Sequence, residues 1–172
     1  FRSDRRGAEE NLRLALANDA KLIDYDLLQL RALLARLKFR PNEERQYIEQ
    51  LVEAFPLSKD YLYQLGESYF QCGDPDGAIK YYLKALELDP GYALAHNHIA
   101  YCYAWKGEHG RALEHFTRYV SIDRTANSFD SLATGYMFAG RYEDAVKTLD
   151  EGIGVNPNID YLYENQARNF IC

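Results

Sequence analysis

The sequence predicts an all-α protein built from successive antiparallel helix pairs. Three observations lead to this expectation. Apolar residues recur at helical spacing along most of the 172 residues. One set of large, small and glycine positions returns after 34 residues and again after 33. Glycine or proline stands between neighbouring apolar stretches, where such residues end one helix or open the next.

The repeat is clearest over residues 59–159. Its first copy consists of Leu62, Leu65, Gly66, Tyr69, Gly73, Ala78, Tyr82, Ala85 and Pro90. The same places in the second copy hold His96, Ile99, Ala100, Tyr103, Gly107, Ala112, Phe116, Tyr119 and Arg124. In the third copy they hold Phe129, Leu132, Ala133, Tyr136, Gly140, Ala145, Leu149, Gly152 and Pro157. Because residue type and spacing agree at most positions, composition alone does not explain the pattern.

This pattern resembles the tetratricopeptide repeat, a helix–turn–helix unit of 34 residues. Residues 59–92, 93–125 and 126–159 match it as three full units. The resemblance implies a right-handed α-solenoid, a superhelix whose first helices line a concave groove and whose second helices form the outer wall. His96, Tyr119 and Arg124 depart from the family pattern in the middle unit.

Gly66 lies on the apolar stripe of its helix, where glycine costs about 1 kcal/mol relative to alanine. Ala100 and Ala133 hold the same place in the later copies, and Ala78 is a small residue of the following helix. Small residues allow two helices to approach closely. We therefore expect Gly66 to pack against its own partner helix.

About ten helices are expected, over residues 4–19, 23–38, 42–55, 59–72, 75–88, 92–105, 109–121, 126–139, 142–154 and 158–171. Residues 1–58 contain degenerate, repeat-like helices, of which the third begins at Pro41-Asn42. Residues 160–172 resemble the first helix of a further unit. A solenoid that begins and ends on half-pairs is expected to be an excerpt of a longer protein.

The charge distribution argues against nucleic acid as a partner. The net charge is −6, with nine Lys/Arg and six Asp/Glu in residues 1–40 but eleven and twenty in residues 41–172. Binding a phosphate backbone requires a basic face. No apolar run reaches the ~20 residues that cross a bilayer, so no membrane partner is expected. The cysteines, Cys72, Cys102 and Cys172, show no disulfide spacing, which favours thiols in a reducing, cytoplasmic setting.

No catalytic or metal site is predicted, and no cofactor. The sequence lacks a G-x-S-x-G nucleophile motif, a glycine-rich phosphate loop and a histidine-rich zinc pattern. His98 and Cys102 stand at i and i+4, where they are able to share a ligand or a proton, but ordinary helix-face positions also explain them. Acidic pairs such as Glu43-Glu44 lie in first turns, where they complement the helix dipole.

A second stripe on each first helix faces the groove in the geometry that the resemblance implies. The predicted peptide-binding residues on this stripe are Tyr63, Glu67, Asn97, His98, Tyr101, Trp105, Asp130, Thr134 and Arg168. For Phe70, Trp105 and Phe138, packing between units is an equally good explanation. Family members that bind acidic C-terminal tails use a Lys/Asn/Arg clamp, which is absent here. The expected ligand is a peptide with apolar residues and Lys or Arg.

Three functional hypotheses follow. The leading one is a non-catalytic protein–protein interaction scaffold that binds a partner segment in the groove. The alternative is a sensory or regulatory domain of a larger bacterial regulator, which binds a small ligand or self-associates through open solenoid ends. This alternative rests on residues 97–103 and 127–132, which are similar to repeats fused to bacterial signalling proteins. The third is an enzyme or metalloprotein that uses His98 and Cys102.

Overall fold

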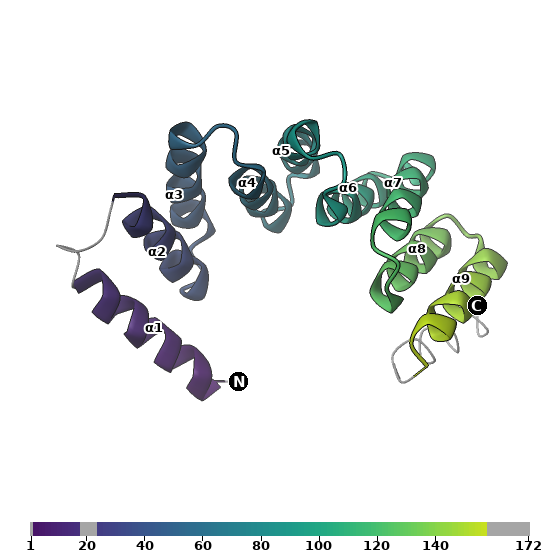
Figure 1. Cartoon of the computed structure of the whole chain (residues 1–172), viewed down its shortest axis with the longest axis horizontal. Coiled ribbons are helices and arrows are strands. Elements are labelled where there is room, and N and C mark those ends of the chain that lie inside the picture. The colour runs from purple at the N-terminus through teal and green to yellow at the C-terminus, as the bar shows by residue number, and fades with distance from the viewer. Residues whose placement is uncertain (1, 18–23, 158–172) are drawn as a thin grey trace. The chain divides into compact units, whose positions relative to one another are not determined.

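A computed structural model describes residues 2–17 and 24–157, and over these residues it contains nine helices and no strand (Figure 1). The helices are α1 (Arg2–Ala17), α2 (Asp24–Leu37), α3 (Pro41–Ala54), α4 (Lys59–Gln71), α5 (Pro75–Leu88), α6 (Ala93–Trp105), α7 (His109–Ile122), α8 (Ala126–Phe138) and α9 (Tyr142–Val155). The predicted all-α fold is confirmed, and each boundary lies within two residues of its expected position. The expected helix over 158–171 lies outside the described residues.

The chain consists of two compact units, and the boundary between them in the sequence lies between Leu88 and Asp89. In the N-terminal unit α2 packs on α3 and α4 packs on α5, while α3 also contacts α4. In the C-terminal unit α6 packs on α7 and α8 packs on α9, while α8 contacts both α7 and α6. Within each unit, consecutive helix pairs are therefore stacked on one another, as a repeat protein requires.

The turns inside the helix pairs share one backbone conformation. Their glycines have left-handed φ values of 74° at Gly73, 75° at Gly107 and 71° at Gly140, a region that suits glycine. Phe39, between α2 and α3, has a φ of 55°. The N–H groups of Phe39 and Arg40 bond back to the end of α2, as those of Gly73 and Asp74 bond back to the end of α4. Phe39 thus occupies the turn position that the other pairs fill with glycine.

Helices α4 and α5 approach each other closely at Gly66. A Cβ atom at this position would lie 2.6 Å from two ring carbons of Tyr82, whose side chain on α5 is fully buried. The expectation that Gly66 packs against its own partner helix is confirmed. The contacting group is an aromatic ring rather than the small side chain of Ala78, so the glycine makes room for a large residue.

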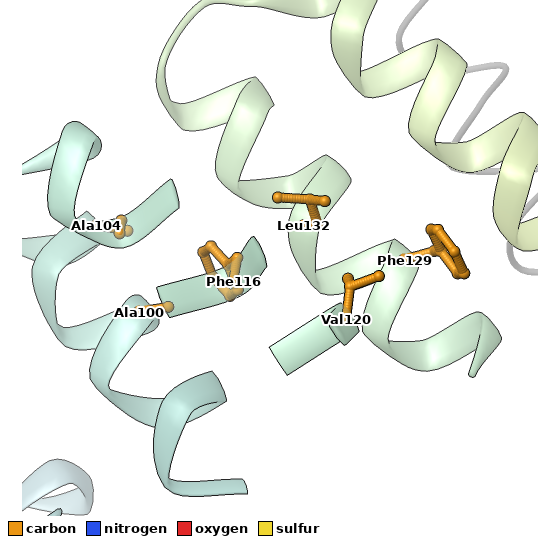
Figure 2. Packing of buried hydrophobic residues seen from close by; sticks show 7 residues of the cluster. Ala100, Ala104, Phe116, Val120, Phe129 and Leu132 are labelled. Carbon is orange, nitrogen blue, oxygen red and sulfur yellow. The ribbon is translucent and has the colours of Figure 1, made fainter. Parts of the chain in front are cut away.

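The core of the C-terminal unit follows the same arrangement. Side chains from α6, α7 and α8 form one buried cluster (Figure 2), which consists of Ala100, Ala104, Ala112, Phe116, Val120, Phe129 and Leu132. Gly135 on α8 again makes room for an aromatic ring, because a Cβ there would lie 2.5 Å from the ring of Phe116. In the N-terminal unit the corresponding cluster contains Ala32, Ile48 and Leu65. Small residues on first helices thus face large residues on their neighbours.

His96 departs from the repeat, and the structure pairs it with His115 of α7. The two Nδ1 atoms lie 3.0 Å apart, and Nε2 of His96 lies 3.3 Å from the carbonyl oxygen of Pro90. A carbonyl oxygen only accepts a hydrogen bond, so His96 carries its proton on Nε2, and its Nδ1 accepts from Nδ1–H of His115. Burial lowers the pKa of His96. Burial, and next the charge of His96, lowers the pKa of His115 to about 4.

The histidine pair predicts a loss of stability in mild acid. An unfolded histidine binds its proton at a pKa of about 6.5, whereas native His115 does so only at about 4. Between these values the unfolded chain binds more protons, so the free energy of unfolding falls as the pH falls. Urea unfolding of wild type and His115→Leu at neutral and mildly acidic pH measures this, and the variant should lose less stability. An equal loss in both proteins would contradict the proposed role of the pair.

Gly66 generates a second prediction. Gly66→Leu should overpack the Tyr82 contact and lower the free energy of unfolding by about 1–3 kcal/mol. Gly66→Ala should also destabilise the protein, although alanine is the better helix former. Gly110→Ala on α7 is the matched control, because no atom among the described residues lies within 4 Å of a Cβ built there. Thermal midpoints check both changes, and equal midpoints for Gly66→Ala and Gly110→Ala would rule out the close crossing.

Candidate peptide-binding surface

The predicted groove residues of the C-terminal unit lie on α6 and α8. These helices are the first helices of consecutive pairs and contact each other, so equivalent positions on them are neighbours. We define the α6–α8 surface as Leu94, Tyr101, Trp105, Asp130, Thr134 and Phe138. It combines apolar side chains with a carboxylate and a hydroxyl group.

Tyr101 joins the two helices of this surface. Its hydroxyl group donates a hydrogen bond to Ser131 Oγ at 3.4 Å, and its ring lies edge-on to Phe116 with centroids 4.9 Å apart. Burial raises the pKa of Tyr101; the nearby negative charge of Asp130 also raises it, while hydrogen bonds to Ser131 and Thr134 oppose the shift. Tyr101 is therefore a neutral, half-buried residue that forms part of the floor of the surface.

The large apolar side chains of the α6–α8 surface remain accessible. Trp105 is 54% exposed, Phe138 is 47% exposed and Leu94 is 45% exposed. Trp105 and Phe138 stand 33 residues apart and occupy the same repeat position at the ends of α6 and α8. From the sequence, packing between units explains them equally well, but about half of each side chain reaches solvent. Exposed aromatic residues on adjacent helices can serve as anchor contacts for a ligand.

The prediction that Asn97 faces the groove is wrong. Asn97 is only 8% exposed, and its Oδ1 atom is buried with no hydrogen-bond partner among the described residues. The physical reason is that α6 contacts both α7 and α8, so its buried face is wider than the single stripe that the repeat pattern predicts. His98 is half-buried on the same helix.

The remaining predicted site residues do not join this surface. Tyr63 and Glu67 belong to the N-terminal unit, where both contact Tyr82. The rings of Tyr63 and Tyr82 lie 5.5 Å apart, and the Tyr82 hydroxyl group donates a hydrogen bond to the Glu67 carboxylate. Glu67 therefore satisfies a buried hydroxyl group. Arg168 lies outside the described residues.

Sequence reasoning missed a pocket in the N-terminal unit. This α2–α4 pocket has a volume of about 480 Å³, within the range of ligand sites. It is lined by Asp26, Gln29, Leu30, Ala32, Leu33, Arg36, Tyr61 and Gln64. The sequence signal for this pocket is Phe39, which stands 34 positions before the turn residue Gly73. Aligning Phe39 with Gly73 places Leu33 and Arg36 at the same repeat positions as Glu67 and Phe70. This alignment was hidden because phenylalanine replaces the glycine.

Other kinds of site find little support in the described part of the chain. No group of three or more His, Cys, Asp or Glu side chains there is arranged to hold a metal ion. Cys102 is fully buried while His98 is half-buried, and both Cys72 and Cys102 are thiols, as predicted. None of the described helices is both long and apolar enough to cross a membrane.

Two family models match parts of the sequence. The tetratricopeptide repeat model matches residues 60–92, and the model described as an Est1 DNA/RNA binding domain matches residues 78–133. Among curated proteins, the chain is similar to mouse serine/threonine-protein phosphatase 5, with 30% identity over 91 residues that cover 52% of the chain and 18% of the phosphatase. The chain spans between 18% and 29% of the curated relatives that it matches.

Solved structures share the fold over nearly the whole chain. TTC0263, a thermophilic repeat protein of Thermus thermophilus, has a TM-score of 0.79 and 20% identity, with coverage of 98% of this chain and 91% of its own. YrrB, described as a repeat protein with an unusual peptide-binding site, has a TM-score of 0.71 and 21% identity, with coverage of 96% and 84%. The match at residues 60–92 identifies a tetratricopeptide repeat in this part of the chain, and the chain shares the fold of tetratricopeptide-repeat proteins.

Proposed function

We propose that this chain is a non-catalytic protein–protein interaction scaffold whose α6–α8 surface binds an extended peptide segment of a partner protein. The observation that carries the proposal is the exposure of Trp105 and Phe138 at one repeat position of two adjacent helices. Aromatic side chains of this size are costly to leave in water and are enriched at interface hot spots. Leu94 extends the apolar contact along α6.

Polar groups beside these anchors favour a peptide that carries Lys or Arg. Asp130 contributes a carboxylate, and Thr134 a hydroxyl group able to bond an extended backbone. Residues 89–172 contain seven Lys/Arg and eleven Asp/Glu, so the unit as a whole attracts cations. The peptide-binding site attributed to YrrB supports the proposal, because it occurs in a protein of the same fold.

A peptide-display selection against the whole chain provides ligands for a test of this surface. Trp105→Ala should weaken binding of a selected peptide by about 2 kcal/mol, or roughly thirtyfold in Kd. Tyr142→Ala is the matched control, since this aromatic residue on α9 is 43% exposed but lies outside the surface. Isothermal titration measures both affinities, and equal losses in the two variants would contradict the assignment. Tyr101→Ala is less informative, because its contacts with Phe116 and Ser131 also stabilise the fold.

The charge of the ligand gives a separate prediction. Asp130→Lys should weaken binding of a basic peptide at low ionic strength, and the effect should shrink as salt screens the interaction. Asp150→Lys on α9 changes the net charge equally without altering the surface. Titrations at low and high salt compare the two variants. A salt-independent loss, or the same loss in Asp150→Lys, would mean that Asp130 does not attract the ligand.

The match to the Est1 DNA/RNA binding domain favours a second candidate function, nucleic-acid binding. The matched residues 78–133 contain six Lys/Arg and six Asp/Glu, whereas a phosphate backbone requires a net positive face. We therefore expect the fluorescence anisotropy of a labelled single-stranded oligonucleotide to detect no binding below about 100 μM at low salt. Tighter binding that weakens steeply with salt would make this the preferred function.

A further inference from the structure

The α2–α4 pocket is chemically different from the α6–α8 surface. Arg36 lines one end of the pocket and Asp26 the other, with Leu30 and Leu33 between them. Residues 27–40 contain four Lys/Arg and no Asp/Glu. Arg36 and Arg40 pair with Glu44 and Glu43 of α3, so the positive character of the pocket is confined to the terminal nitrogens of the Arg36 guanidinium group.

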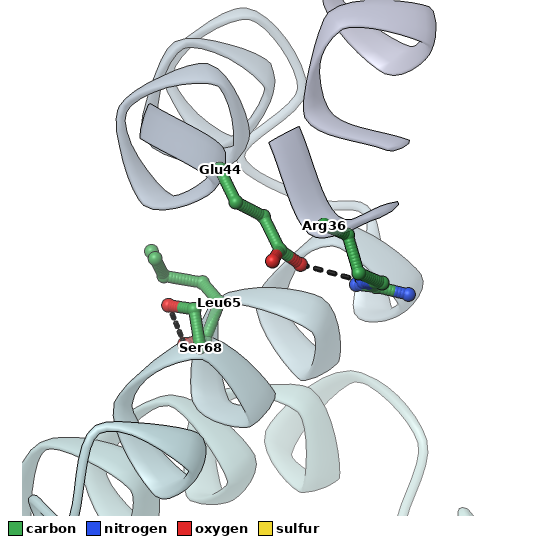
Figure 3. Close-up of polar contacts among 4 residues, drawn as sticks. All are labelled: Arg36, Glu44, Leu65 and Ser68. Carbon is green, nitrogen blue, oxygen red and sulfur yellow. Dashed lines mark hydrogen bonds and ion pairs between the residues drawn. The ribbon is translucent and has the colours of Figure 1, made fainter. Parts of the chain in front are cut away.

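Arg36 is held in place by a buried carboxylate. Its Nε donates a hydrogen bond to Glu44 Oε1 at 2.6 Å, and the Glu44 side chain is 4% exposed while that of Arg36 is 45% exposed. Figure 3 shows that a terminal nitrogen of the guanidinium group points away from Glu44. An arginine that is fixed through Nε still has N–H groups on its terminal nitrogens, which match the two oxygens of a carboxylate. Glu44 thus preorganises a donor group at the pocket.

The other lining residues suit an extended chain next to that donor group. Leu33 is 43% exposed and offers an apolar contact. Gln29 donates a hydrogen bond from Nε2 to the Tyr61 hydroxyl group, which fixes its amide at the pocket wall, and Gln64 adds a second amide. Such amides can bond the backbone of a peptide.

The spacing of the charged ends defines the ligand further. Asp26 and Arg36 are ten positions apart on one helix, which corresponds to about 15 Å. An extended chain covers that distance in roughly five residues. A ligand that fills the pocket therefore places an acidic group at one end and a basic or neutral group at the other.

We propose that the α2–α4 pocket is a second peptide site, which binds a segment whose acidic side chain pairs with Arg36 and whose apolar side chain covers Leu33. The inference rests on the proposed function, since it assumes that the chain binds extended peptides, but it names a different surface and a ligand of different charge. The Lys/Asn/Arg clamp that some family members use for acidic C-terminal tails is absent, but Arg36 does not belong to the positions compared with that clamp.

The test uses the whole chain and a synthetic peptide, acetylated and amidated, of sequence Glu-Ser-Leu-Ser-Lys, together with its Glu→Gln analogue. Titration followed by NMR chemical shifts should place the peptide on α2 and α4, and the analogue should bind roughly tenfold more weakly. Arg36→Gln alone would leave Glu44 buried without its partner. The double variant Arg36→Gln with Glu44→Gln avoids this, and the difference between the two peptides should disappear in it.

Leu33 provides a test at an exposed position. Leu33→Glu should weaken binding of the acidic peptide about tenfold, because it removes the apolar contact and adds a negative charge near Arg36, and Leu33→Lys should weaken it less. Leu83→Glu on α5 is the matched control, because Leu83 is 40% exposed and lies outside the pocket; it should leave the affinity unchanged.

Three outcomes would overturn the inference. They are an absence of binding, equal effects of Leu33→Glu and Leu83→Glu, and a Glu→Gln difference that persists in the double variant. Trp105→Ala should leave the affinity for the acidic peptide intact. Loss of binding in Trp105→Ala but not in Leu33→Glu would place the peptide on the α6–α8 surface, which defeats this inference while supporting the proposed function.

Discussion

Close contact between neighbouring helices is the constraint on which the rest of this structure depends. At Gly66 and Gly135 a helix meets an aromatic ring at a distance that excludes even a Cβ atom. Where a first helix must accommodate such rings, its small residues are confined to the side that faces its neighbours, and its larger polar and aromatic residues are left for the opposite side. The composition of the α6–α8 surface and of the α2–α4 pocket follows from this division. Interior packing and binding surface are thus set by the same helices.

Much of this arrangement was predictable from the sequence, because the same residue types recur at equivalent positions in several copies of the repeat. The position of Gly66 in the repeat predicted the close crossing there, and the expected boundaries of the nine described helices lie within two positions of those observed. The prediction failed where a helix has more contacts than the repeat pattern describes, as at Asn97, which is enclosed because α6 touches two neighbours. The repeat pattern also gave no prediction where one residue departs from it. Because Phe39 replaces the turn glycine, the repeat positions of α2 were not recognised, and the pocket that contains Arg36 was missed. The accessibility of Trp105 and Phe138 is a property of neighbouring side chains, which periodicity alone does not determine.

The net charge of −6 does not indicate the local charge of either the α6–α8 surface or the α2–α4 pocket. Asp130 acts on Tyr101 in a unit with an excess of acidic residues, whereas Arg36, which pairs with Glu44, lines the α2–α4 pocket. Electrostatic attraction acts over about 10 Å at ordinary salt, so a ligand responds to the charges beside it rather than to the total. The two proposed sites would therefore select two classes of partner.

The left-handed backbone at Phe39 has a consequence for the local stability of the N-terminal unit. A residue with a Cβ atom loses about 1 kcal/mol in this conformation, a penalty that the turns at Gly73, Gly107 and Gly140 avoid. Local opening requires less free energy where the closed state is strained, so the conformation of Phe39 lowers the free energy of opening the α2–α3 turn. Arg36 lies in the last turn of α2, directly before this turn. Strain at Phe39 thus lies within one helical turn of the Arg36–Glu44 ion pair, and a ligand that binds Arg36 only in the closed state would oppose the opening of this turn.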